Sequence, residues 1–230
     1  IYLPSMPDWS ARFHADQAAV QLTFNAYVIA YGGLGVFYGP LSDRHGRRRI
    51  LLVGLAVAAA GSLLGALATD LPTLIAARLL QGAGSGAGLV AGRASVQDLF
   101  QGPQRTRVMA YVGMVMGLCP PAATLIGGQL HERLGWHANF VLVLVLAVGL
   151  WLAAWRGLPS ASPTVPPGSH WLRDMGAAYR RLLGEPAFVL NVAILAFTVA
   201  AFYAFLSGAP LVLHSQGVGP AQVGWYIMQV

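Results

Sequence analysis

Charge is scarce in this sequence, and lysine is absent. Only 10% of its 230 residues are charged, whereas an ordinary soluble domain is about 25% charged. All 14 basic residues are arginine, and 56% of the residues are hydrophobic. This composition excludes an ordinary soluble domain and is typical of a chain embedded in a lipid bilayer.

Cysteine is nearly absent as well. Cys119 stands alone, which excludes an intrachain disulfide and a multi-cysteine metal site. The 6 histidines lack metal-ligand spacing, and no nucleophile is accompanied by a candidate base. A membrane enzyme needs clustered histidines or carboxylates at the membrane face, so we expect a protein that is not an enzyme and holds no metal or cofactor.

A signal-peptide pattern is also missing. The chain begins at Ile1, with no basic region and no cleavage pattern after it. We therefore expect the chain to be part of a longer protein.

Long uncharged runs are what the sequence does contain. A helix of about 20 apolar residues spans a bilayer core. The runs predict an all-helical membrane protein with an N-terminal transmembrane bundle over residues 1–156. Its expected helices are a truncated first helix at 1–7 and complete spans at 17–39, 50–69, 73–97, 108–130 and 138–156, with a polar loop at 8–16. The span at 73–97 is apolar but is interrupted by Arg78 and Arg93.

A second bundle is predicted after a linker. Residues 159–168 are rich in proline and serine, which is typical of a linker that does not pack. Within the cytoplasmic linker at 157–186, apolar residues at helical spacing predict an amphipathic helix lying in the membrane surface. These residues are Trp171, Met175, Tyr179, Leu182 and Leu183. Residues 187–230 are expected to start the C-terminal bundle, with a span at 187–208, a loop containing Pro210 and Pro220, and another span from 223.

The arginines predict the orientation, because short cytoplasmic loops carry the basic excess. One set of alternating loops, at 40–49, 98–107 and 156–186, holds ten arginines, whereas the other set holds only Arg12 and Arg133. We expect the first set to be cytoplasmic. The net charge of +6 therefore reports membrane orientation rather than nucleic-acid binding.

Arg78 lies inside a predicted span. With entry near Leu71, it lies roughly 10 Å into a core about 30 Å thick, whereas Arg93 reaches the cytoplasmic face. Placing arginine at that depth costs about 2.5–3.5 kcal/mol, so Arg78 is expected to face a polar cavity or a partner. Arg78, Gln81 and Asn25 are the candidate cavity residues. Hydrogen bonds to neighbouring helices are the alternative interpretation for all three.

Glycines and prolines indicate helix packing. Gly82, Gly84, Gly86 and Gly88 sit in an apolar run with no strand before it, which favours close helix packing over a nucleotide-binding loop. In the span at 108–130, prolines predict a bend and glycines predict the close approach of a neighbouring helix. The residues concerned are Gly113, Gly117, Pro120, Pro121, Gly127 and Gly128.

Four stretches resemble signatures of the major facilitator superfamily. Gly39-Pro-Leu-Ser-Asp43-Arg44-His-Gly46-Arg47-Arg48 resembles the signature between that family's second and third helices. Arg78-Leu-Leu-Gln81-Gly82, with Asp98 downstream, resembles the fourth-helix signature of drug-exporting members. Gly117 through Gly127-Gly128 resembles the fifth-helix signature of antiporters. Tyr2-Leu-Pro4-Ser-Met-Pro7 is similar to the end of the first helix in the bicyclomycin and chloramphenicol resistance group of drug:proton antiporters.

The resemblance implies a twelve-helix transporter made of two six-helix halves. This chain would supply the first half, with its first helix truncated, and the first one or two helices of the second. The implied function is efflux of small apolar or amphipathic drugs, driven by the proton gradient, by a monomer in the bacterial inner membrane. Asp43, Arg44, Arg47 and Asp98 would form a cytoplasmic latch, and the coupling carboxylate would stand just before Ile1.

Two other functions stay open. A uniporter or symporter of sugars or metabolites is compatible with the same spans, and collapse of export when the proton gradient is dissipated would argue against a facilitator. A membrane scaffold or sensor that transports nothing would carry a signalling or catalytic motif, and none is present in these 230 residues.

Overall fold

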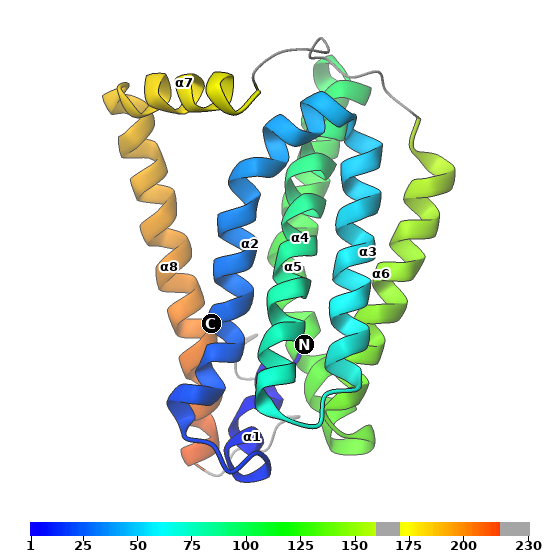
Figure 1. The fold of residues 1–230 in the computed structure, drawn as a ribbon, viewed down its shortest axis with the longest axis vertical. Coiled ribbons are helices and arrows are strands. Elements are labelled where there is room, and N and C mark those ends of the chain that lie inside the picture. Colours follow the sequence, from blue (N-terminus) through cyan, green and yellow to red (C-terminus); the bar gives the residue numbers. More distant parts are fainter. Residues whose placement is uncertain (160–170, 217–230) are drawn as a thin grey trace.

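The computed structural model describes residues 1–159 and 171–216 (Figure 1). The elements are, in chain order, η1 (Leu3–Ser5), α1 (Met6–Arg12), α2 (Gln17–His45), α3 (Arg47–Ala66), α4 (Leu71–Leu99), α5 (Gly102–Leu134), α6 (His137–Gly157), α7 (Trp171–Leu183) and α8 (Pro186–Ser215). These two ranges contain helices and no strand. The predicted all-helical fold is confirmed.

Six helices in the described ranges are long and apolar enough to cross a membrane, namely α2 to α6 and the Pro186–Phe205 part of α8. Figure 1 shows them with their long axes roughly parallel, whereas α7 runs roughly perpendicular to them at the level of their upper ends, on the side of α8 and α2. Many of their large apolar side chains are exposed, and none of the spanning part of α8 is buried inside the protein. Exposed apolar surfaces of this kind are stable in contact with lipid, and a helix forms hydrogen bonds between its own backbone N–H and C=O groups. The chain is therefore a multi-pass integral membrane protein.

The second helix extends further than predicted. The expected span ended at residue 39, but α2 continues through Pro40 to His45. The helix ends at Gly46, whose φ of 88° suits glycine and whose N–H donates to the Ser42 carbonyl at 2.9 Å. The motif expected in a loop therefore occupies the end of α2, the Gly46 turn and the start of α3.

The ends of the described chain also differ from the expectation. Much of the loop expected at 8–16 is helical, because α1 runs to Arg12 and buries Trp9 completely. The loop expected after residue 208 is helical as well, because α8 continues through Pro210 to Ser215; proline is tolerated in membrane helices when neighbouring groups satisfy the freed backbone. Residues 160–168 of the linker, Pro220 and the span expected from 223 lie outside the described residues.

The fourth helix forms the centre of the bundle, with α2 and α3 packed against it. A Cβ at Gly82 would overlap the α2 backbone, and a Cβ at Gly84 would overlap the α3 backbone at Gly54 and Ala58. The expected close packing therefore occurs on two sides of α4. It does not occur at Gly88, where a Cβ would meet open space.

An aromatic core joins the start of the chain to α6 at the lower end of Figure 1. The Trp9 ring lies 5.8 Å from that of Tyr2 and 5.5 Å from that of Trp136. Beside this core, His131 Nε2 lies 2.7 Å from an Asp8 carboxylate oxygen. The upper end, where α2, α4 and α6 finish, carries the loops rich in arginine; we call it the arginine-rich end.

Candidate functional site

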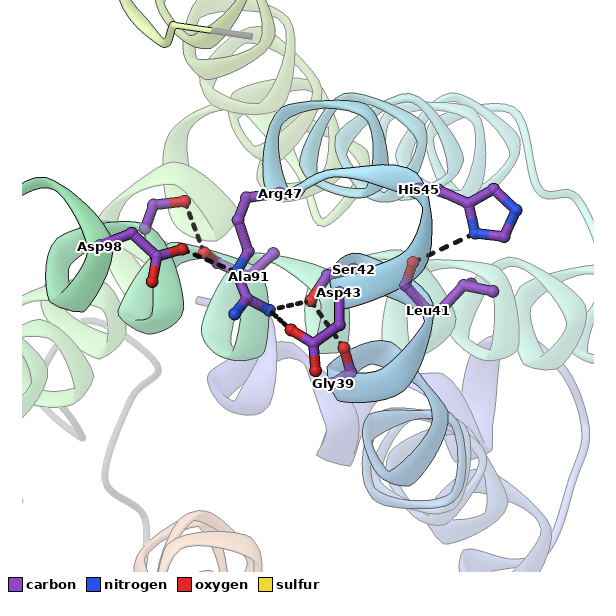
Figure 2. Close-up of polar contacts among 9 residues, drawn as sticks. Gly39, Leu41, Ser42, Asp43, His45, Arg47, Ala91 and Asp98 are labelled. Carbon is purple, nitrogen blue, oxygen red and sulfur yellow. Dashed lines mark hydrogen bonds and ion pairs between the residues drawn. The ribbon is translucent and has the colours of Figure 1, made fainter. Parts of the chain in front are cut away.

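A charge cluster joins three helices at the arginine-rich end, and Figure 2 shows Arg47 at its centre. From the start of α3, Arg47 contacts Asp43 Oδ1 on α2 at 2.5 Å and Asp98 Oδ2 on α4 at 3.0 Å. Its NH1 also donates to Ser42 Oγ at 2.6 Å. We call these four residues the Arg47 cluster.

Local sequence explains how the Arg47 cluster is positioned. The Gly46 turn reverses the chain, so that Arg47 faces back over the last turn of α2. The Ser42 hydroxyl donates to the Gly39 carbonyl at 2.8 Å, which leaves its oxygen available to accept from Arg47. The Arg47 side chain is only 19% exposed, whereas Asp98 is 48% exposed. A single arginine therefore holds two carboxylates in a partly screened setting, where each pair contributes about 0.2–1 kcal/mol.

The other residues of the motif lie beside the cluster. Arg44 is half-buried at the end of α2. The Arg48 guanidinium donates to the backbone carbonyl of Trp155 and so links α3 to the end of α6. A surface pocket of about 30 Å³ lies against Arg47 and Arg48. Drug-sized ligands need about 300–1,000 Å³, so this pocket is too small for one.

A second polar cluster lies within the membrane span of α4. Arg78 is 5% exposed and Gln81 is 3% exposed. Arg78 NH1 donates to Gln81 Oε1 at 2.5 Å, and Gln81 Nε2 donates to Ser62 Oγ on α3 at 2.8 Å. The Ser62 hydroxyl in turn donates to the Ala58 carbonyl at 2.8 Å, which completes a chain of three hydrogen bonds.

Two tyrosine rings flank the buried guanidinium. The Arg78 Cζ lies 3.9 Å from the ring centroid of Tyr2 and 4.3 Å from that of Tyr27. Such cation–π contacts contribute about 2 kcal/mol each when desolvated, which offsets much of the cost of burying arginine. Among the described residues, nothing accepts a hydrogen bond from the buried Arg78 Nε. We call Arg78, Gln81, Ser62, Tyr2 and Tyr27 the Arg78 cluster.

Sequence reasoning missed three members of the Arg78 cluster. Ser62 is one serine in an apolar run, and the two tyrosines belong to other segments of the chain. Helical spacing places Gln81 next to Arg78 because they are three residues apart, but no local signal pairs either of them with Ser62. Asn25, the third predicted cavity residue, is exposed on α2 and lies outside this hydrogen-bonded cluster.

The fifth helix departs from its expected packing. A Cβ at Gly113 or Gly117 would meet open space, so no helix of the described chain approaches closely there. Gly127 and Gly128 are buried, and a Cβ at Gly127 would overlap the backbone of Ile1. Pro120 and Pro121 lie inside α5, and the Thr124 hydroxyl donates to the Pro120 carbonyl at 2.8 Å. The glycines thus pack closely only around Gly127, because no helix of the described chain comes near Gly113 or Gly117.

The chain is similar to known proteins over nearly its whole length. The sequence profile of the Major Facilitator Superfamily matches residues 1–229. Multidrug resistance protein D of Escherichia coli (strain K12) is 33% identical over 95% of this chain and 56% of its own length. The chloramphenicol resistance protein of Pseudomonas aeruginosa is 30% identical over 99% of this chain and 53% of its own length.

A third relative, the cephamycin export protein of Amycolatopsis lactamdurans, is 32% identical over 82% of this chain and 38% of its own length. The chain thus spans about half, or less, of the length of these relatives. The profile match and the identities agree with the six apolar helices and with the motifs that build the Arg47 and Arg78 clusters. The chain belongs to the Major Facilitator Superfamily of membrane transporters.

Proposed function

We propose that the complete protein exports small amphipathic or apolar drug-like molecules across the bacterial inner membrane by alternating access. The single observation that carries the proposal is the Arg78 cluster, which places a buried guanidinium between two aromatic rings inside a membrane span. The printed names of relatives that confer drug resistance or export an antibiotic support the substrate class.

The chemistry of the Arg78 cluster suits such substrates. Aromatic faces bind flat apolar groups, and a few fixed polar groups set the orientation of a ligand. Arg78 supplies hydrogen-bond donors and is held by Gln81, which in turn donates to Ser62. A substrate that carries a carbonyl, hydroxyl or similar acceptor would meet oriented donors here once a change of conformation exposes the buried Arg78.

The proposed architecture follows the predicted domains. Residues 1–156 form the first bundle, 157–186 a cytoplasmic linker and 187–230 the start of the second bundle, within a protein that acts as a monomer. The Arg47 cluster serves as the cytoplasmic latch, because one guanidinium holds the ends of α2, α3 and α4 together. Its ion pairs are exposed enough to break and re-form as the halves rock against each other.

The proton gradient is the proposed energy source, with no cofactor. A drug:proton exchanger loses active export when a protonophore collapses the gradient, whereas a uniporter of sugars or metabolites continues to equilibrate its substrate. Drug accumulation in cells that express the complete protein, with and without a protonophore, distinguishes the two mechanisms.

Two variants test the proposed roles of Arg78 and Asp43. We expect Arg78→Ala to lower export about 10- to 100-fold, the range that corresponds to losing a charged hydrogen bond in a buried site. Asp43→Ala is expected to lower the rate by weakening the latch, and Arg105→Ala, at an exposed position of α5, serves as the control. Export that survives both Arg78→Ala and Asp43→Ala unchanged would overturn the assignment.

A further inference from the structure

The helix α7 lies roughly perpendicular to the membrane spans at the level of the arginine-rich end, next to α8 and on the side of α2 (Figure 1). Helical spacing places its apolar residues on one side and its three arginines on the other. The side chains of Arg173, Arg180 and Arg181 are all exposed. A short helix of this pattern, perpendicular to the spans, is suited to the boundary between lipid headgroups and acyl chains.

The C-terminal part of the apolar side of α7 is not covered by the described protein. Leu182 is 40% exposed and Leu183 is 67% exposed, although both belong to the apolar side. The environment that surrounds α7 must be apolar on one side of the helix and polar on the other. A membrane surface satisfies both requirements at once, and it lies at the level of the span ends where α7 is found.

The charged side of α7 indicates which lipid covers it. In the part of the chain that the structure describes, no ion pair or hydrogen bond occupies the guanidinium groups of Arg173, Arg180 and Arg181. Asp174 and Glu185 are the acidic residues nearby in the sequence, so basic residues are in excess. Arginines near a bilayer surface attract anionic headgroups, and the last turn of a helix favours cations in addition.

The Tyr179 side chain connects α7 to α2, the helix whose end carries Asp43 of the Arg47 cluster. The Tyr179 hydroxyl donates to the Val36 carbonyl on α2 at 2.7 Å. In an α-helix that carbonyl would accept from the residue four positions on, but this residue is Pro40, which has no N–H. Tyr179 therefore supplies a hydrogen bond that the proline removes.

The contact is also close to the Arg47 cluster. Asp43 follows Val36 by seven residues, which is about two helical turns and returns to the same face of α2. A displacement of α7 would therefore act on the segment of α2 that leads to the Asp43 carboxylate.

We propose that α7 docks on anionic phospholipid headgroups through Arg173, Arg180 and Arg181 and that Tyr179 transmits this docking to the proline-containing end of α2. The proposal goes beyond the export function, and it needs no substrate to be tested.

The first experiment measures lipid docking directly. The purified chain is placed in vesicles of phosphatidylcholine alone or of phosphatidylcholine with added phosphatidylglycerol, and hydrogen–deuterium exchange is followed by mass spectrometry. We expect the α7 amides to exchange about tenfold more slowly in the anionic vesicles. The effect should weaken at high salt, because the Debye length shrinks from about 10 Å at 0.1 M to about 3 Å at 1 M.

Matched variants decide whether α7 itself is responsible. Replacing Arg173, Arg180 and Arg181 together with glutamine should abolish the lipid-dependent slowing in α7. Replacing Arg105 and Arg107 with glutamine, both exposed at the same end of the bundle, should leave it in place. Equal loss in both variants, or α7 protection that is the same in neutral vesicles, would overturn the proposed docking.

Tyr179→Phe tests the connection to α2. This variant keeps the apolar ring and removes only the hydroxyl donor. We expect lipid-dependent protection to persist in α7 but to disappear from residues 36–45 of α2. If the α2 segment still responds to phosphatidylglycerol in Tyr179→Phe, the proposed transmission is wrong. These readouts do not involve transport, so their failure is distinct from failure of the proposed export function.

Discussion

Arg47 and Asp98 are 51 residues apart in the sequence, and a contact of 3.0 Å between Nε and Oδ2 joins them at the arginine-rich end. The pair ties the start of α3 to the end of α4, and Asp43 adds the end of α2 to the same guanidinium. Because one ordered arginine serves two carboxylates, its side-chain entropy is lost once for both contacts. The Arg47 cluster therefore holds the three helix ends together at a lower entropic cost than two separate surface ion pairs would.

A double-mutant cycle on Arg47→Gln and Asp98→Asn measures the coupling free energy between these two side chains. We expect a coupling free energy of about 0.5–1 kcal/mol, because both side chains are partly exposed and solvent screens the pair. Unfolding midpoints in a mild detergent provide the measurement, and the coupling should decrease as salt is added. Arg49→Gln, at an exposed position of the same helix, is the control. A coupling energy of zero at low salt would contradict the ion pair.

The hydrogen-bonded chain through Ser62 predicts a difference between two buried serines. Ser62→Ala removes the acceptor of Gln81 Nε2 and should destabilise the fold by about 1–2 kcal/mol. Ser95→Ala should cost about 0.5 kcal/mol or less, because Ser95 Oγ donates only to the Ala91 carbonyl of its own helix. The two variants are compared by unfolding in the same detergent. Equal effects would show that Ser62 does not position Gln81.

The glycines of α4 predict opposite signs for one substitution. Gly84→Ala places a Cβ against the α3 backbone and should destabilise the protein by about 1–3 kcal/mol. Gly88→Ala meets open space and should stabilise the helix by up to about 1 kcal/mol through its higher propensity. Unfolding midpoints of the two variants give the comparison. A stable Gly84→Ala variant would mean that α3 and α4 are not in close contact.

Lowering the pH should weaken the N-terminal cap of α4, which Asp70 forms. The Thr73 backbone N–H donates to Asp70 Oδ1 at 2.8 Å, and this bond, helped by the Thr73 hydroxyl, lowers the pKa of the Asp70 carboxyl. A carboxyl whose folded pKa is lowered stabilises the fold above its unfolded pKa of about 3.9 and loses that contribution as the pH falls through the folded value.

The measurement is the unfolding midpoint of the wild-type chain and of Asp70→Asn, followed from about pH 6 down to pH 2. We expect the difference between them to shrink as Asp70 becomes protonated, because the neutral carboxyl no longer gains from accepting two hydrogen bonds. A difference that stays constant down to the acid end would show that the cap does not depend on ionisation.

Much of the fold was predictable from the spacing of charges along the chain. Uncharged runs of about 20 residues identify spans because a helix must cover the hydrocarbon core without exposing charge. This reasoning locates α2 to α6 and the start of α8. It misplaces helix ends such as that of α2, because Pro40 and Asp43 are tolerated in a terminal turn that only the Gly46 conformation ends.

The candidate sites were predictable in part. The depth of Arg78 in its span marks it as costly and in need of partners. The partners themselves were visible only for Gln81, which lies one helical turn away. Ser62 comes from α3, Tyr27 from α2 and Tyr2 from the residues before η1, and nothing local to Arg78 selects them.

The sequence by itself determined that this chain spans a bilayer several times, where the middle of each span lies, and which family it resembles. These properties depend on the transfer of each segment from water to lipid, and that free energy is a property of local composition. The tertiary structure decided that Arg47 holds Asp43 and Asp98, that tyrosine rings enclose Arg78, and that Tyr179 caps the Val36 carbonyl. Those contacts depend on how helices pack, and packing is set by side chains far apart in the sequence that meet only in the folded bundle.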